Sequence, residues 1–233
     1  MNQKLFFSVL ILVIGMSFFS RAFAQTLGSE LSDKELDDRL SWIQNELSAD
    51  RNPSRWWLYS WTGAFCLLAA TQTTILFATS DTHLKQNMGV GAVESLFGIV
   101  GMLLTPFEST TAADSLHALP DISREEREDK LSTAERLLQK SAKDEAFGRS
   151  WLKHVAGFAF NIAGGLVIWK GFHHSLLDGL LNFGIGMAVT ELQIFTQPTR
   201  SMHAFDDYRK QYAVSASIRF VPKPVGFAVA ISF

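Results

Sequence analysis

The chain has 233 residues, of which 47% are hydrophobic and 19% are charged, and its net charge is −2. This composition can support a buried core, which excludes a disordered tail or a low-complexity linker. The lack of a basic excess argues against a nucleic-acid partner. A single cysteine, Cys66, excludes an intramolecular disulfide and a cysteine-rich zinc or iron–sulfur site.

Residues 1–24 have the pattern of a secretory signal peptide. Lys4 provides a positive start, an apolar run follows, and Ala22 and Ala24 are the small residues that precede a cleavage site. We therefore predict cleavage after residue 24, with an uncleaved membrane anchor as the alternative. The leader indicates a location in the cell envelope of a bacterium. It favours an inner-membrane protein with periplasmic parts over a periplasmic or outer-membrane protein.

The mature chain contains an internal duplication. Residues 32–47 are repeated at 123–138 with six identities in sixteen positions. Residues 97–121 are repeated 86 positions later with eight identities in twenty-five. Because self-similarity at a fixed offset is typical of repeat architectures, we predict two tandem repeats, residues 25–121 and 122–208.

Each predicted repeat begins with a charged amphipathic helix. Ser32 and Ser123 are each followed three residues later by a glutamate, which is the spacing of a capping box. In the first repeat an apolar stripe follows at helical spacing: Leu36, Leu40, Ile43 and Leu47. We expect this stripe to pack on neighbouring helices. A helix on a lipid surface is the alternative, although such helices are usually basic.

An apolar helical hairpin follows the amphipathic helix in each repeat. Four stretches contain almost no Asp, Glu, Lys or Arg: 56–80, 86–107, 154–169 and 179–199. A helix needs about 20 apolar residues to cross a bilayer. The sequence therefore predicts a mainly α-helical fold with four membrane helices. A soluble or peripheral helical bundle is the alternative, because polar residues interrupt these stretches.

Residues 209–233 have a different pattern. Apolar residues alternate with small or polar residues over 212–220 and 227–233, and two prolines lie between these runs. This predicts a C-terminal β-hairpin with one apolar face, which needs cover because a lone hairpin is marginally stable. The end of the chain at Phe233 resembles the terminal strand of outer-membrane barrel proteins. Since two strands cannot close a barrel, several chains would then have to contribute.

Four polar residues within the apolar stretches are candidate functional residues: Gln72, Glu94, Asn161 and Glu191. An ionisable group at membrane depth is costly and is therefore a functional candidate. The alternative is that each polar group hydrogen-bonds to a facing helix.

Two histidines, His117 and His203, occupy matching positions in the two repeats. They are candidate metal ligands, but we expect each to cap or pack a short helix, and so no metal. His173 and His174 lie near Asp178, but neighbouring histidines point to different faces of a helix, so we expect no shared ligation.

The sequence contains no phosphate-binding loop, no zinc-protease helix motif and no nucleophile elbow. We therefore predict that the protein is not an enzyme and needs no cofactor. The sequence favours an exported envelope membrane protein with a structural or interaction role. Its partners are membrane lipid and either envelope proteins or a second copy bound through the C-terminal hairpin. The alternatives are a small transporter or channel, and a soluble periplasmic carrier of an apolar ligand.

Overall fold

The computed structural model describes residues 31–105, 107–212, 217–222 and 227–232. The chain divides into two units, one formed by residues 37–211 and the other by residues 1–36 with 212–233. The predicted signal peptide lies outside the described residues and stays a prediction.

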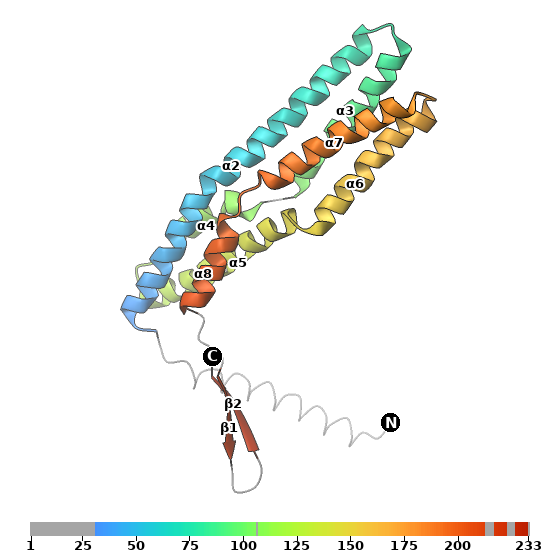
Figure 1. Ribbon diagram of the computed structural model, residues 1–233. Coiled ribbons are helices and arrows are strands. Elements are labelled where there is room, and N and C mark those ends of the chain that lie inside the picture. Colours follow the sequence, from blue (N-terminus) through green and yellow to red (C-terminus); the bar gives the residue numbers. More distant parts are fainter. Residues whose placement is uncertain (1–30, 106, 213–216, 223–226, 233) are drawn as a thin grey trace, which may run out of the picture. The chain divides into compact units, whose positions relative to one another are not determined.

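The first unit is helical, which confirms the predicted mainly α-helical fold (Figure 1). Its elements in chain order are α2 (Asp33–Ala78), α3 (Thr82–Leu104), η1 (Glu108–Thr110), α4 (Ala112–His117), α5 (Arg124–Gly148), α6 (Trp151–Leu166), η2 (Val167–Gly171), α7 (Leu176–Phe195) and α8 (Arg200–Tyr212). The element η2 is a π-helical turn that continues α6. A π-turn of this kind is often found near a functional site.

The two amphipathic helices begin where the sequence places them. The Oγ of Ser123 accepts the backbone N–H of Glu126 at 3.2 Å, and the Glu126 carboxylate accepts the N–H of Ser123 at 2.9 Å. The Oγ of Ser32 accepts the N–H of Glu35 at 3.1 Å at the start of α2. The predicted apolar stripe is buried, with no member more than 5% exposed: Leu36, Leu40, Ile43 and Leu47.

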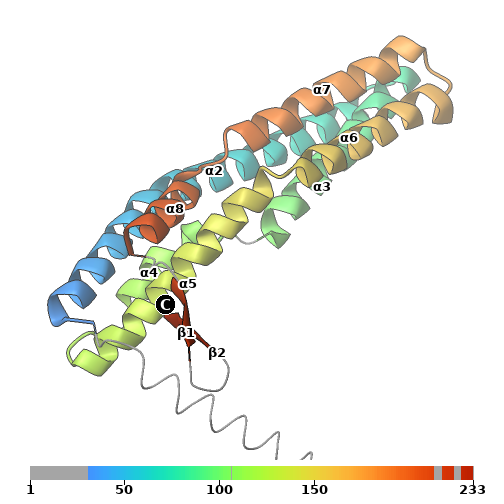
Figure 2. The ribbon, with the colours of Figure 1, turned by 60° about the horizontal axis from the view of Figure 1, so that its bottom comes forward.

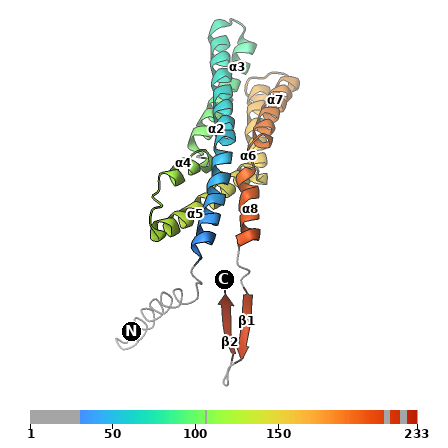
Figure 3. The ribbon, with the colours of Figure 1, turned by 90° about the vertical axis from the view of Figure 1, so that its left-hand side faces the viewer.

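Residues 37–211 have a charged half and an apolar half. The charged half contains the start of α2 together with α4, α5 and α8, and the apolar half contains the end of α2 together with α3, α6 and α7 (Figures 1 and 2). Helix α2 is 46 residues long and passes through both halves, although Pro53 removes one backbone donor from it. Figure 3 shows the hairpin α2–α3 beside the hairpin α6–α7.

The predicted repeats contain the same order of elements. In the first, α2 carries both the amphipathic segment and the first apolar segment, and α3 and α4 follow. In the second, α5 and α6 carry these segments separately, and α7 and α8 follow. The guanidinium of Arg149, at the α5–α6 break, donates to the carbonyls of Phe195 and Gln197 at 3.1 and 3.3 Å. The duplication itself stays a prediction.

Three helices in the described part of the chain are long and apolar enough to cross a membrane, where the sequence predicts four. They are Asp33–Ala78, Thr82–Leu104 and Trp151–Gly171. Helix α7 has 20 residues and is not among them; polar side chains interrupt its sequence at Asp178, Asn182, Glu191 and Gln193. The expectation of four apolar spans is therefore corrected to three, judged by length and composition.

Large apolar side chains cover the outer surface of these helices. Leu67, Phe77 and Leu104 are 69%, 80% and 75% exposed. No more than 22% of the residues in the apolar segment of each of the three long helices are buried. A water-soluble bundle instead turns its apolar side chains inward and leaves only limited apolar patches outside.

The C-terminal segment contains two short strands, β1 (Ser217–Pro222) and β2 (Phe227–Ser232), which pair antiparallel with Ile218 opposite Ile231. The connecting turn and the side chains of this segment lie outside the described residues. The predicted hairpin with one apolar face, and its packing on the helices, therefore stay predictions.

Helices α6 and α7 approach each other closely at two glycines. A Cβ atom at Gly165 would lie 2.6 Å from the carbonyl oxygen of Gly179, and a Cβ atom at Gly179 would lie 2.7 Å from the carbonyl oxygen of Gly165. Neither backbone oxygen can move without moving its helix. The two helices can therefore approach this closely only because Gly165 and Gly179 have no side chain.

We predict that Gly165→Ala destabilises the protein by about 1–3 kcal/mol, because the added methyl group separates α6 from α7. The matched control is Gly184→Ala on α7, where a Cβ atom meets nothing within 4 Å. Denaturation midpoints of the detergent-purified variants, followed by helical circular dichroism, measure the difference. Equal midpoints for the two variants would contradict the close packing.

Candidate functional site

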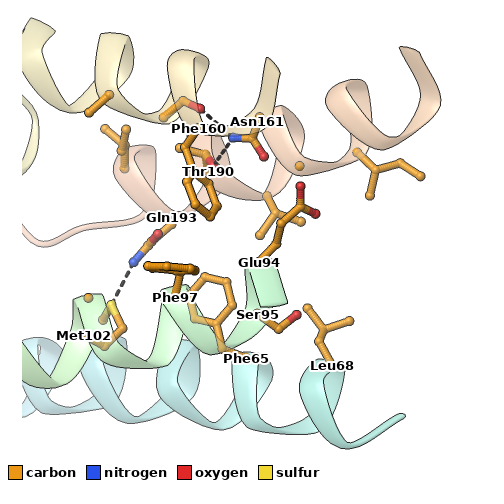
Figure 4. A pocket seen from close by; sticks show the side chains of 18 of the residues that line it. Phe65, Leu68, Glu94, Ser95, Phe97, Met102, Phe160, Asn161, Thr190 and Gln193 are labelled. Carbon is orange, nitrogen blue, oxygen red and sulfur yellow. Dashed lines mark hydrogen bonds between the residues drawn. The ribbon is translucent and has the colours of Figure 1, made fainter. Parts of the chain in front are cut away.

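A cavity of about 680 Å³, which we call the chamber, lies among α2, α3, α6 and α7 (Figure 4). Its apolar walls include Phe65, Leu68, Phe97 and Phe160. The rings of Phe97 on α3 and Phe160 on α6 meet edge to face, with centroids 5.4 Å apart, and so connect the two hairpins. This volume is in the range of small-molecule sites, which are about 300–1,000 Å³.

Glu94 extends from α3 toward the facing hairpin (Figure 4). Its Oε2 accepts a hydrogen bond from Nδ2 of Asn182 on α7 at 3.2 Å. Its Oε1 is buried without a hydrogen-bond partner in the described part of the chain, and so is Oδ1 of Asn182. Both oxygens face Gly164 on α6, where a Cβ atom would lie 1.9 and 3.0 Å from them. Two unpartnered acceptors therefore lie close to the backbone of Gly164, and a donor between them would remove a desolvation cost.

Asn161 and Gln72 are the other predicted residues that line the chamber. The Nδ2 of Asn161 donates to the carbonyl of Gly157 at 2.8 Å and to Oγ1 of Thr190 at 3.0 Å. The Oε1 of Gln72 accepts a hydrogen bond from Oγ of Ser95 at 2.8 Å. These amides have the partners on their own or a facing helix that a buried polar group needs.

Several of these polar side chains lie against a glycine of a facing helix. A Cβ atom at Gly91 would lie 2.4 Å from the amide of Gln72, and one at Gly186 would lie 1.9 Å from that of Asn161. Each glycine leaves room for a polar group to approach the backbone of another helix, in the way that small residues allow close contacts between membrane helices.

Glu191, the fourth predicted residue, lies outside the lining of the chamber. It faces His154 on α6, whose Nδ1 is 2.8 and 3.0 Å from the two carboxylate oxygens. The four predicted polar residues therefore separate into three that line the chamber and one that joins α6 to α7.

The chamber also contains polar residues outside the four candidates, among them Asn182, which was not considered from the sequence. Asn182 contacts Glu94, and the Nε2 of Gln193 donates to the Sδ of Met102 at 2.8 Å. Asn182 interrupts an apolar stretch just as Asn161 does, so the same criterion could have selected it. Its pairing with a residue 88 positions away has no sequence signal.

The charged half contains a buried pair of carboxyl groups, Asp50 on α2 and Glu145 on α5, both 0% exposed. The Oδ2 of Asp50 accepts a hydrogen bond from Ser201, and the Oε2 of Glu145 accepts the backbone N–H of Met202 at 2.9 Å. Ser109 of η1 donates to Oε1 of Glu145 at 3.3 Å. The pair thus connects α2, α5, η1 and α8.

Burial and the adjacent Asp50 carboxyl raise the pKa of Glu145 to about 8. Removal from water disfavours the charged form, and a neighbouring carboxyl disfavours it further. Glu145 therefore keeps its proton at neutral pH and hydrogen-bonds to Asp50. Sequence alone did not single out this pair, because acidic residues on amphipathic helices usually face water.

The structure gives no shared metal site to His117 and His203. The Nε2 of His117 lies 3.3 Å from Oγ of Ser48. Among the described residues, neither histidine belongs to a group of three or more metal-ligating side chains. Asp121, which the sequence places near His117, contacts Nζ of the buried Lys130 at 2.8 Å.

Comparisons with protein families, curated proteins and solved structures find no match to this chain.

We predict that stability falls as the pH rises from about 5 to 8, and that Glu145→Gln flattens this dependence. The pKa of Glu145 is raised above its unfolded value of 4.5. Folded protein therefore holds one more proton in this range, and its stability decreases by at most about 1.4 kcal/mol per pH unit. Denaturation midpoints between pH 5 and 8 measure the slope.

The matched control for this prediction is Glu128→Gln, on the same helix, where an exposed carboxylate pairs with Arg124. This variant should keep the slope of the original chain. The same slope for Glu145→Gln and for the unchanged chain would show that Glu145 is not the titrating group.

Proposed function

We propose that the protein is a membrane protein of the bacterial cell envelope whose chamber binds an amphiphilic small molecule. The exposed apolar side chains of the three long helices support insertion in lipid, because water does not tolerate such a surface on a monomer. The signal peptide predicted at residues 1–24 would direct export, and the inner membrane is the favoured location. No motif supports catalysis, so the proposed role is binding.

The observation that carries the proposal is the pair of unpartnered acceptors, Oε1 of Glu94 and Oδ1 of Asn182. Both face Gly164, in a cavity whose lining is mostly apolar but includes other polar side chains such as Gln72 and Asn161. A ligand with a hydrogen-bond donor at its polar end, such as an amine or an alcohol, would satisfy both. Its apolar part would contact aromatic walls such as Phe65 and Phe97.

In the absence of ligand, a proton on Glu94 can serve as the donor between the two acceptors. Glu94→Gln imitates that protonated state, since the added amide N–H can hydrogen-bond to Asn182. The substitution should therefore keep the fold while replacing the unpartnered acceptor by a donor and removing the negative charge that a donor on a ligand would contact. This separates a binding role of Glu94 from a purely structural one.

Transport of the ligand is a second candidate function, because polar groups also lie at both ends of the chamber. Asp144 and Gln197 line one end, and Asn87 and Asp178 line the other. Movement of a solute into protein-containing liposomes, stopped by Glu94→Gln, would favour transport over binding alone.

The test uses a long-chain amine with a fluorescent tail and the carboxylic acid of the same length. We predict that the amine binds at least about tenfold more tightly, since a hydrogen bond to a charged group contributes about 1.5–3 kcal/mol. Glu94→Gln should abolish this preference. Gly164→Ala should weaken binding of the amine, because the added methyl group would collide with Oε1 of Glu94 and displace the carboxylate. Fluorescence titration of the purified chain measures both effects.

The controls are Glu191→Gln, which changes an acid outside the chamber, and Gly184→Ala, which adds a methyl group where nothing lies within 4 Å. Both should bind the amine as the unchanged chain does. If the amine and the acid bind equally, or if Glu94→Gln keeps the preference, the proposed role of the acceptor pair is wrong.

A further inference from the structure

Three potential metal ligands meet at the end of the chamber where α3 and α7 begin. His83 lies in the first turn of α3, His174 precedes α7, and Asp178 lies in its first turn. Each offers one ligand atom, and these atoms all lie within 4.8 Å of one another. Asp178 also lines the chamber. The group combines a residue from the first hairpin with two from the second.

The backbone around His174 places its side chain in this group and excludes that of its neighbour. His173 has a φ of 59°, in the left-handed region. The N–H of His174 donates to the carbonyl of Ile168 at 3.3 Å, which closes the turn after η2. Adjacent histidines thus point differently, as the sequence indicates, but His174 and Asp178 converge with a third residue that the sequence analysis did not consider.

One ring nitrogen of His174 forms a hydrogen bond, and the other has no hydrogen-bond partner in the described part of the chain. Its Nε2 lies 2.7 Å from Oε1 of Gln86, an amide oxygen that can only accept, so Nε2 carries the hydrogen. Its Nδ1 therefore has a lone pair, and this atom is buried with no hydrogen-bond partner in the described part of the chain. A metal-ligating histidine has this arrangement, in which the second nitrogen donates to an oxygen that fixes the tautomer.

A neighbouring amide, that of Asn87, can orient the ring of His83 in a similar way. The Nε2 of His83 lies 3.4 Å from Oδ2 of Asp178, and its Nδ1 lies 3.5 Å from Nδ2 of Asn87. The Oδ1 of Asn87 is buried without a partner. A half-turn of this amide places Oδ1 opposite Nδ1 of His83, which then donates its N–H and leaves Nε2 as a ligand. The rings of His83 and His174 stack with centroids 3.6 Å apart, so one ring has to turn for both nitrogens to reach one metal in the plane of each ring.

Asp178 is held by the start of α7. Its Oδ2 accepts hydrogen bonds from the backbone N–H and the hydroxyl of Ser175 at 3.1 and 2.6 Å. The backbone N–H of Asp178 donates to Oγ of Ser175 at 3.2 Å, which completes a capping box. These bonds fix the carboxylate without using all of its acceptor positions, because a carboxylate has about four lone-pair sites.

We propose that His83, His174 and Asp178 bind a divalent transition metal, with zinc as the best match. Two imidazole nitrogens and a carboxylate oxygen are a common donor set for zinc, with a fourth position open to water or to a ligand. The metal links the start of α3 to the start of α7 and so joins the two hairpins at one end of the chamber. Gln86 and Asn87 orient the two histidines.

The experiment titrates the detergent-purified full-length chain with Zn²⁺ alone, in competition with a chromophoric chelator. We expect one Zn²⁺ per chain, and at least a tenfold loss of affinity in the double variant His83→Ala/His174→Ala. Gln86→Leu, which removes the support of His174 but no ligand, should weaken binding by about 10–100-fold. Cobalt bound in place of zinc should give the visible absorption of a four-coordinate site in the unchanged chain and lose it in the double variant.

The matched control is His173→Asn, which removes an adjacent histidine and tolerates the positive φ at this position. His117→Ala/His203→Ala removes two histidines elsewhere. Both should bind Zn²⁺ as the unchanged chain does, and helical circular dichroism should be unchanged in every variant. Equal affinity in the unchanged chain and in His83→Ala/His174→Ala, or an equal loss in His173→Asn, would overturn the site. Glu94→Gln should keep the zinc affinity, so failure of the chamber proposal and failure of the metal proposal are distinguishable.

Discussion

The stability of the apolar half depends on hydrogen-bond partners for the polar side chains that lie between its two apolar hairpins. In hydrocarbon, a polar group that leaves water needs a partner within the protein. Gln72, Asn161 and Glu94 each cross to a facing helix at a glycine, where the missing side chain provides the space. The hydrogen bonds of the two amides connect helices, whereas Glu94 leaves one oxygen unpartnered. Glu94 therefore differs from the two amides in its unpartnered oxygen, and the proposed ligand site rests on that oxygen.

In the charged half, a bound proton stabilises two carboxyl groups that are buried together. Asp50 and Glu145 are removed from water together, and two adjacent negative charges would be unfavourable there. Retention of a proton by Glu145 changes this repulsion into a hydrogen bond, and serines and a helix N-terminus satisfy the remaining oxygens. This pair joins four helical elements near the α5–α6 break. It therefore fixes the relative positions of the helices in the charged half, which continue into the apolar helices.

Local patterns in the sequence predict the helices, the capping box at Ser123 and the buried stripe that includes Leu40 and Ile43. These features depend on residues three or four positions apart, so the sequence displays them directly. The apolar criterion also selects three of the residues that line the chamber. It overestimates α7 as a span, because Asn182, Glu191 and Gln193 interrupt the predicted apolar stretch.

Contacts between distant segments could not be predicted in this way. Asp50 meets Glu145 and His83 meets His174 because two hairpins pack side by side, and no local spacing encodes that packing. His117 and His203, at matching positions of the predicted repeats, belong to no metal-ligating group in the described part of the chain. Equivalent residues of two repeats lie close together only if the symmetry axis that relates the repeats passes near them. His83 and His174 lie at the turns of two adjacent hairpins, so their proximity does not depend on such an axis.

The central claim is that the apolar helices lie in lipid with their polar residues turned toward the chamber. Spin labels at positions 67, 103 and 95, introduced singly into a chain with Cys66 replaced by alanine, test it directly after reconstitution into liposomes. Leu67 and Leu103 are exposed in the structure, whereas Ser95 is buried. The account predicts that labels at 67 and 103 relax strongly with oxygen and weakly with a water-soluble nickel chelate, and that the label at 95 is protected from oxygen relative to them. Strong relaxation of the labels at 67 and 103 by the nickel chelate would place these surfaces in water and contradict the account.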